Sequence, residues 1–322
     1  MTVAEQTLHY LRRPHEAVPD GPVKSAAAWR SADLRERSRD WIAPLGSEQI
    51  AELDRAYEAV RGLPMAEVTR SNFPLPGLAD EIQRWREEIS RGLGVVLVRG
   101  FPVEAWGEEK TSVVFWGVGR HLGRPGVQNE MGELLGHVRD TRESTVDPNV
   151  RLYKTASDIA FHCDAADAVG LLCLETARSG GASRIASSVA VFNRLMEVRP
   201  KLAERLFEPV LLDVRSENEE GGLRHFPVPP CRHADGTLRT FYHSDYFRSV
   251  VRHPDVPSLD RLEQELFDAY EAIAGSPEFY FDMILERGDL QLISNHTVVH
   301  SRTGYEEHSE RRRHLLRLWL SL

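Results

Sequence analysis

The feature that most constrains the fold is a change of pattern near residue 151. Before this point the apolar residues recur at helical spacing, and after it the chain breaks into short apolar runs separated by turn residues. Helical segments at 189–206 and 258–274 interrupt these runs. Helices followed by many short strands predict a mainly β fold, a sandwich or barrel with helical support. The expected strands are 169–174, 183–187, 209–214, 238–242, 279–285, 290–294, 298–301 and 314–322.

The N-terminal part predicts a helical layer and one buried strand. Helices are expected from Ser47, as an N-cap, to Gly62, from Leu78 to Leu93 and from Glu108 to Leu122. The apolar run 95–98 predicts the strand. Residues 1–40 are rich in proline, alanine and charge, which predicts an extension that wraps or frays, and residues 41–322 then form a single domain.

Composition excludes several classes of protein. The net charge of −9 argues against a nucleic-acid partner. The longest apolar runs fall far short of the roughly 20 residues that cross a bilayer, which argues against a membrane partner. The three cysteines form no CxxC pair, and residues 1–14 lack the apolar stretch of a secretory signal. We therefore expect a reduced, cytoplasmic protein.

The strongest local signal is the sequence Phe161-His162-Cys163-Asp164. In an extended segment His162 and Asp164 project from one face, while Cys163 points away from it. An imidazole and a carboxylate on one face are two of the three ligands of a facial site that suits non-haem Fe(II). The alternative is a hydrogen-bonded His–Asp pair at the end of a strand, and the HxD motif alone does not separate the two.

A third ligand is offered by the segment from Asn295 to Arg302. His296 and His300 form an HxxxH pair, which also occurs on the helix of zinc proteases. Thr297 stands where such a protease needs a glutamate, and the β-branched run 297–299 favours a strand over a helix. The zinc-protease interpretation is therefore disfavoured.

Arg313 and Arg317 lie four residues apart at the start of an apolar strand. Alternation places both on one face with Leu315, and His314, Leu316 and Leu318 on the other. Two guanidinium groups that face a barrel interior need anionic partners, so they predict a bound carboxylate or a salt bridge. Arg311 and Arg312 are interpreted as a solvated basic turn.

Together these blocks resemble the Fe(II)/2-oxoglutarate dioxygenases of the taurine dioxygenase (TauD/TfdA) and clavaminate synthase-like family. The resemblance covers roughly residues 95–322 and is best in 159–195 and 288–322. It implies a double-stranded β-helix (jelly-roll) core with a helical insert and a metal at one mouth of the barrel. The implied cofactors are Fe(II), 2-oxoglutarate as cosubstrate and O2. The motifs that carry it are His162-x-Asp164, Gly180-Gly181-Ala182-Ser183, Asn295-x4-His300-x-Arg302 and Arg313-x3-Arg317.

The resemblance also implies roles for individual residues. His162, Asp164 and His300 match the catalytic iron ligands; His300 fits better than His296 because of its spacing from Asn295 and Arg302.

Arg313 matches the arginine that pairs with the distal carboxylate of 2-oxoglutarate. Ser183 stands where the taurine enzyme usually has a threonine that binds the same carboxylate; the alternative is a strand-start residue after a Gly-Gly turn. Arg317 matches an arginine that faces either the substrate or the cosubstrate.

Substrate contacts are expected from two further regions. Asn129 lies in a loop similar to the family's pocket loop, although a turn residue is the alternative interpretation. Tyr246 and Arg248 lie in a region that often forms a lid in this group and are candidates for holding a carboxylate; the alternative is surface polarity. The histidines 225, 233, 243 and 253 are interpreted as surface or packing residues.

The implied activity is the oxidation of a C–H bond in a small molecule, with release of succinate and CO2. Hydroxylation, desaturation and oxidative cyclisation stay open, whereas Asp164 disfavours halogenation because related halogenases carry glycine or alanine there. The expected substrate is an amino acid or related carboxylate, by analogy and because Arg317 is a spare cation. The alternatives are a taurine-type sulfonate dioxygenase, a non-catalytic metal-binding jelly-roll protein and a protein-modifying oxygenase. A homo-oligomer is expected from the resemblance alone.

Overall fold

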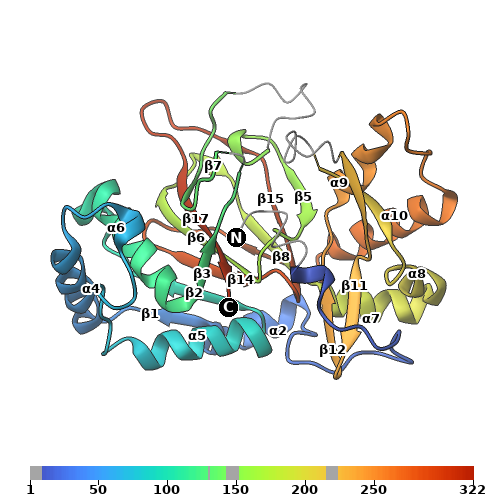
Figure 1. Ribbon diagram of the computed structural model, residues 1–322, viewed down its shortest axis with the longest axis horizontal. Helices are drawn as coiled ribbons and strands as arrows, with labels where there is room; N and C mark the ends of the chain where they lie inside the picture. Colours follow the sequence, from blue (N-terminus) through green and yellow to red (C-terminus); the bar gives the residue numbers. More distant parts are fainter. Residues whose placement is uncertain (1–8, 130, 143–151, 215–223) are drawn as a thin grey trace.

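The strand-rich part of the chain forms two sheets in a computed structural model, which describes residues 9–129, 131–142, 152–214 and 224–322 (Figure 1). The larger sheet has seven described strands in the order β1-β2-β14-β6-β17-β3, with β4 beside β17. The smaller sheet has the order β13-β8-β15-β5. The strands of the larger sheet are β1 (Ile42–Pro44), β2 (Val95–Arg99), β3 (Arg124–Gly126), β4 (Gly136–Val138), β6 (Ala168–Glu175), β14 (Leu290–Ser294) and β17 (His314–Ser321). Those of the smaller sheet are β5 (Ile159–His162), β8 (Ser183–Ser187), β13 (Tyr280–Met283) and β15 (Val298–Arg302).

An apolar core fills the space between the two sheets. One cluster of buried side chains joins Val95, Ile293 and Leu315 of the larger sheet to Ile185 and Val298 of the smaller one. Alternate residues of the same strands face outward, as the period of two requires. The predicted sandwich of short strands is therefore confirmed.

A helical layer covers the outer face of the larger sheet, on the left of Figure 1. It consists of α4 (Ser47–Val60), α5 (Ala79–Arg91) and α6 (Val103–Leu122). Their apolar faces pack on outward-facing side chains such as Val96, Leu292 and Leu316. One predicted boundary was wrong: Gly46, not Ser47, is the N-cap of α4, with the Gln49 side chain accepting from its N–H. The predicted helix 108–122 is the continuous part of α6, which a break at Gly107 separates from a first turn that begins at Val103.

A second helical group packs on the smaller sheet, on the right of Figure 1. It contains α7 (Ser188–Val198), α8 (Pro200–Arg205) and α10 (Arg261–Ala274), which share a core with Phe161 and Val299. The expected continuous helix 189–206 is two helices, because Pro200 lacks an N–H and instead starts α8. Other described elements are α2 (Ser31–Glu36), α3 (Ser38–Trp41), α9 (Ser244–Ser249), the hairpins β9 (Val210–Asp213) with β10 (His225–Val228) and β11 (Cys231–Ala234) with β12 (Thr237–Thr240), the pair β7 (Ser179–Gly180) with β16 (Tyr305–Glu306), and the 3-10 turns 65–67, 152–154 and 250–252.

The described part of the N-terminal extension packs on the body of the protein. Tyr10 and Val23 belong to the core under α7 and α10, and Trp29 and Leu34 to the core between the sheets. The Trp29 indole donates to the carbonyl of Leu93 at 2.7 Å. The division at residue 40 stays a prediction.

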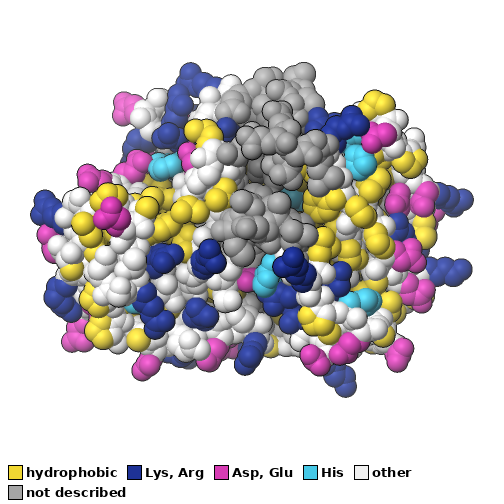
Figure 2. Space-filling view, viewed as in Figure 1, with side chains coloured by type: hydrophobic (Ala, Val, Ile, Leu, Met, Phe, Trp, Pro, Cys, Tyr) yellow, Lys and Arg dark blue, Asp and Glu magenta, His cyan; other side chains and the backbone are white. Residues whose placement is uncertain are grey.

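The described surface shows no single dominant charge on the face seen in Figure 2, where acidic and basic side chains are interspersed. Among the described helices, none has both the length and the apolar character that a bilayer crossing requires.

The buried carboxylate of Asp167 links segments near both ends of the chain to the larger sheet. It accepts from Arg13 at 2.6 Å, from His296 at 2.8 Å and from the backbone N–H of Leu322 at 3.0 Å. Burial opposes ionisation, but these donors hold the pKa of Asp167 well below its ordinary 3.8. We expect Asp167→Asn to lower the free energy of unfolding at pH 7 by about 2–3 kcal/mol.

Because the folded pKa of Asp167 is depressed, its contribution is full above the unfolded value and is lost as the pH falls below about 4. Urea unfolding at pH 7, 4 and 3 measures this change. Asp268→Asn, which removes an exposed partner of Arg248, serves as the control and is expected to cost under about 1 kcal/mol. An equal effect of both substitutions would contradict the role of Asp167.

Candidate metal centre and active site

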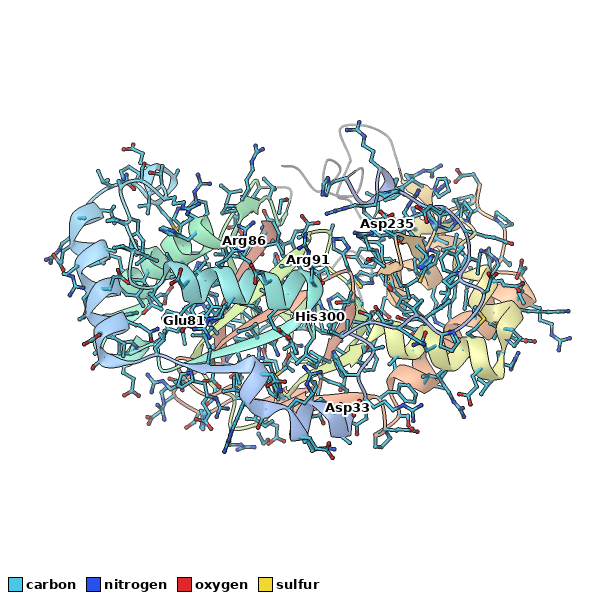
Figure 3. All side chains as sticks on the ribbon, turned by 90° about the horizontal axis from the view of Figure 1, so that it is seen from below. Asp33, Glu81, Arg86, Arg91, Asp235 and His300 are labelled. Atoms are coloured by element: carbon cyan, nitrogen blue, oxygen red, sulfur yellow. The ribbon has the colours of Figure 1, made fainter. Side chains whose placement is uncertain are left out.

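Three predicted ligand residues converge at one end of the smaller sheet. One ligand atom from each of His162, Asp164 and His300 lies within 4.8 Å of the other two. His162 Nε2 is 3.9 Å from one Asp164 carboxylate oxygen, and His300 Nε2 is 3.5 Å from the other. The three side chains expose at most 12% of their surface. Figure 3 labels His300 near the middle of the view, and its side chain is buried.

Strand pairing places these residues. His162 ends β5 and lies opposite His300 of the antiparallel β15, so the two rings lie 4.2 Å apart between centroids. Asp164 follows two residues later, and Cys163 between them is buried, with its thiol toward the carbonyl of Val298 at 3.7 Å. The alternation predicted for this segment is confirmed.

Neighbouring backbone groups orient the site. His162 Nδ1 lies 2.9 Å from the carbonyl of Ala160, which makes Nδ1 the donor and leaves the Nε2 lone pair toward Asp164. The Asn295 side chain accepts the backbone N–H of Asp164 at 3.0 Å. Sequence reasoning used Asn295 only as a spacing marker and missed this contact, because the contact joins residues 131 positions apart.

The protonation states of His162 and Asp164 favour the binding of a cation. Burial, followed by the nearby His300, lowers the pKa of His162 to about 4, so its ring is neutral at neutral pH. Burial alone would raise the pKa of Asp164, but the hydrogen bond from His300 and the positive Arg317 hold it well below its ordinary value. A neutral His162 ring beside an ionised Asp164 matches the protonation states that metal binding requires.

Arg313 lies at the start of β17, almost fully buried, with one guanidinium nitrogen 3.3 Å from the carbonyl of Gly181. Gly181 has a φ of +70°, and a Cβ there would lie 2.9 Å from Arg313 Nε, so this position needs glycine. Arg313 Nη1 is buried and has no hydrogen-bond partner among the described residues. Burial lowers the pKa of Arg313. An unpartnered buried donor of this kind fits an incoming carboxylate.

A second buried arginine lies close to Arg313. Arg302 donates to the carbonyls of Thr155 and Ser157, and Tyr305 lies between the two guanidinium groups, 4.9 Å and 5.1 Å from them. Burial and the charge of Arg313 lower the pKa of Arg302 to about 10. Two cations at such close range favour an anion beside them.

Ser183 and Arg317 occupy defined positions on facing strands. The Ser183 hydroxyl donates to the Gln291 side chain at 2.9 Å, a partner that the sequence did not suggest. Arg317 Nε donates to Gln128 at 2.6 Å, and its guanidinium lies 4.5 Å from the Tyr153 ring. Leu316 and Leu318 pack under the helical layer, whereas Leu315 packs between the sheets, so the predicted alternation of β17 is confirmed.

The three expected substrate contacts have other partners. Asn129 donates to Glu133 within its own loop at 2.6 Å, and it is the neighbouring Gln128 that contacts Arg317. Arg248 donates to Asp268 at 2.8 Å and to Glu271 at 3.3 Å, which does not favour its holding a substrate carboxylate.

Tyr246 stacks on His243 at 3.7 Å between ring centroids, and His243 lies 4.9 Å from His162. His243 is therefore a packing residue, as expected, and it packs on His162 of the cluster without being a member of the cluster itself. Its signal in the sequence was weak because the approach depends on a bridge between residues 162 and 243.

His296 does not join the cluster. Its ring donates to Asp167, as described above, and it lies in the turn between β14 and β15. The structure thus separates the two histidines of the HxxxH motif, with His300 at the centre and His296 beside the chain ends.

Comparison with known proteins assigns the chain to a family. The family model for "Taurine catabolism dioxygenase TauD, TfdA family" matches residues 59–319. The FR-33289 synthase of Streptomyces rubellomurinus is 29% identical over 94% of this chain and 91% of its own length.

Two solved structures share the fold. An asparagine oxygenase in complex with Fe(II), 2S,3S-3-hydroxyasparagine and succinate has a TM-score of 0.69 at 15% identity, over 87% of this chain and 93% of its own. The non-heme iron oxygenase OrfP in complex with Fe and alpha-ketoglutaric acid has a TM-score of 0.64 at 15% identity, over 87% and 94%.

The matched family covers most of the chain, including the smaller sheet, most of the larger sheet and all three members of the cluster. The expected jelly-roll core with added helices and the expected oxygenase class are confirmed. The chain belongs to the TauD/TfdA family of dioxygenases.

Proposed function

We propose that this chain is an Fe(II)- and 2-oxoglutarate-dependent dioxygenase that hydroxylates a C–H bond of a free amino acid or a related small carboxylate. The observation that carries the proposal is the convergence of His162, Asp164 and His300. Two imidazoles and one carboxylate hold a non-haem iron while leaving other coordination positions open. This donor set fits Fe(II).

The bound iron and 2-oxoglutarate supply the oxidising chemistry, which consumes O2 and releases succinate and CO2. The protein residues bind and orient. His162 and His300 offer their Nε2 atoms, and Asp164 offers an ionised carboxylate whose backbone is fixed by Asn295. The carbonyl of Ala160 holds His162 in the tautomer that leaves Nε2 free of a proton.

Arg313 is proposed to bind the distal carboxylate of 2-oxoglutarate. Its unpartnered Nη1, its burial and the glycine beside it all support this role. Ser183 is proposed to add a hydrogen bond to the same carboxylate, with Gln291 holding its hydroxyl in place. Arg317 is proposed to face the carboxylate of the substrate or of the cosubstrate, oriented by Gln128.

The substrate class rests on the solved relatives and on the cationic site. The asparagine oxygenase structure holds a hydroxylated asparagine, and an OrfP structure holds (3S)-hydroxy-L-Arg. A carboxylate-bearing amino acid suits the positive charge of Arg317. The roles of Asn129, Tyr246 and Arg248 stay predictions, as do a homo-oligomeric state and the absence of a nucleic-acid partner. Cytoplasmic location is part of the proposal and is supported by three buried free thiols.

The test is turnover with a panel of free amino acids and taurine, under isotope-labelled O2. We expect one amino acid or carboxylate to stimulate succinate release and to gain one labelled oxygen atom, while the second oxygen enters succinate. Loss of two hydrogens without label would indicate desaturation or cyclisation. Taurine as the only active compound would overturn the amino-acid assignment in favour of a sulfonate dioxygenase. Iron binding without any 2-oxoglutarate turnover would favour the non-catalytic alternative.

A further inference from the structure

A second cluster of potential ligands lies on the opposite side of the larger sheet from Arg313 and Arg317. It brings together Glu108 of α6, His137 of β4 and His314 of β17. Because successive residues of a strand face opposite sides, His314 points toward the helical layer while Arg313 points into the barrel. The cluster is therefore separate from the candidate metal centre.

The geometry of this cluster is compact. One ligand atom from each residue lies within 4.8 Å of the other two. His137 Nδ1 and His314 Nε2 form a hydrogen bond of 2.9 Å, and the two ring centroids are 5.1 Å apart. Glu108 places one carboxylate oxygen 3.9 Å from His137 Nδ1 and the other 3.8 Å from His314 Nδ1. The strands β4 and β17 fix the two rings, because His137 pairs with Leu316, two residues beyond His314.

The local backbone places Glu108 at the start of a helical segment. Gly107 breaks α6 with a φ of +70°, a value that favours glycine, and Glu108 begins the continuous part that follows. Glu108 and His137 are partly exposed, at 56% and 36%, so an ion from solution reaches them.

The charges of the surroundings permit a cation. Glu108 and His314 line an open pocket together with Glu104, Glu175, Arg287, Arg311 and Arg312. Arg287 is paired with Glu104 and lies 3.8 Å from Glu175, and Arg311 lies 3.6 Å from Glu175. Among these lining residues three carboxylates balance three guanidinium groups.

We propose that Glu108, His137 and His314 bind a divalent transition-metal ion of the zinc class, at a site distinct from the candidate iron centre. Two imidazoles and one carboxylate are a ligand set that Zn²⁺ takes, with water from the open pocket completing the coordination. Such an ion joins three elements, since α6, β4 and β17 each supply one ligand. The ion would thereby link α6 to the larger sheet, next to Arg313.

The test measures Zn²⁺ stoichiometry and affinity by calorimetry on tag-free, metal-stripped protein. The parent is the His162→Ala, His300→Ala variant, which lacks two ligands of the candidate iron centre. We expect it to bind one Zn²⁺ per chain. Adding His137→Ala is expected to weaken this binding at least about 100-fold, and Glu108→Gln at least about tenfold. Both positions are partly exposed, so their substitution leaves the core intact.

The matched control is His225→Ala in the same parent. His225 is a partly buried histidine 3.0 Å from the carboxylate of Asp255, but it belongs to neither ligand cluster. We expect its removal to leave Zn²⁺ binding unchanged. Absence of Zn²⁺ binding in the parent variant would overturn the proposal, and so would binding that survives His137→Ala or is lost equally with His225→Ala.

Discussion

His300→Ala is expected to abolish Fe(II) binding and to reduce turnover at least about 10³-fold, because the reaction depends on the metal. His300 contributes one of the three converging ligand atoms, and its ring also neighbours Asp164 at 3.5 Å. His162→Ala is expected to have the same effect. The measurement is iron content per folded chain after anaerobic reconstitution, together with succinate release under saturating 2-oxoglutarate.

His296→Ala provides a matched control. His296 is a second, partly buried histidine four residues earlier, and its ring contacts Asp167 rather than Asp164. We expect this variant to lose stability but to retain one Fe(II) per folded chain. Loss of iron in His296→Ala together with full retention in His300→Ala would show that the ligand assignment is wrong.

Arg313→Ala is expected to raise the concentration of 2-oxoglutarate needed for half-maximal turnover by about 10²–10³-fold while leaving iron content unchanged. Removing a buried guanidinium that is paired with a carboxylate typically costs about 2–5 kcal/mol of binding free energy. Each 1.4 kcal/mol corresponds to about a tenfold change in affinity. Arg313→Lys keeps the charge but not the forked geometry, so we expect only partial recovery. Steady-state kinetics over a range of 2-oxoglutarate concentrations measure the effect.

The control for Arg313 is Arg311→Ala. Arg311 is 59% exposed and 3.6 Å from Glu175, at the outer surface of the same turn. We expect its removal to leave the 2-oxoglutarate dependence unchanged. An equal shift in both variants would indicate a general effect of the basic turn and not a carboxylate site at Arg313.

Local patterns in the sequence predicted much of the fold and the three residues that converge in the structure. The alternation in β17 and in the segment His162–Asp164 was sufficient to place side chains on faces, because it depends only on the strand period. The spacing of the four family motifs then indicated which histidine joins the site. His300, in the buried strand β15, fits this pattern, and His296, in the preceding turn, does not.

The residues that the sequence did not reveal act through long-range contacts. Gln128 reaches Arg317 across 189 positions, and Gln291 reaches Ser183 across 108. The same limit explains His243, which approaches His162 only when strands from different parts of the chain are brought together. Glutamine and histidine are common on loops, so no local signal separates these from other polar residues.

The second ligand cluster illustrates the same point. Glu108, His137 and His314 are separated by 29 and 177 positions and belong to a helix and two strands. His314 was assigned to the apolar-facing side of β17 from alternation, and this placement is confirmed. Only the pairing of β4 with β17 and the packing of α6 on that face bring the other two residues beside it.

The most direct measurement of the central claim is a titration of anaerobic, Fe(II)-loaded protein with 2-oxoglutarate, followed by visible absorption. The account predicts a weak, saturable metal-to-ligand charge-transfer band, which is absent from His300→Ala and needs much more 2-oxoglutarate in Arg313→Ala. A folded, iron-loaded wild-type protein that develops no such band would contradict the assignment of 2-oxoglutarate as cosubstrate.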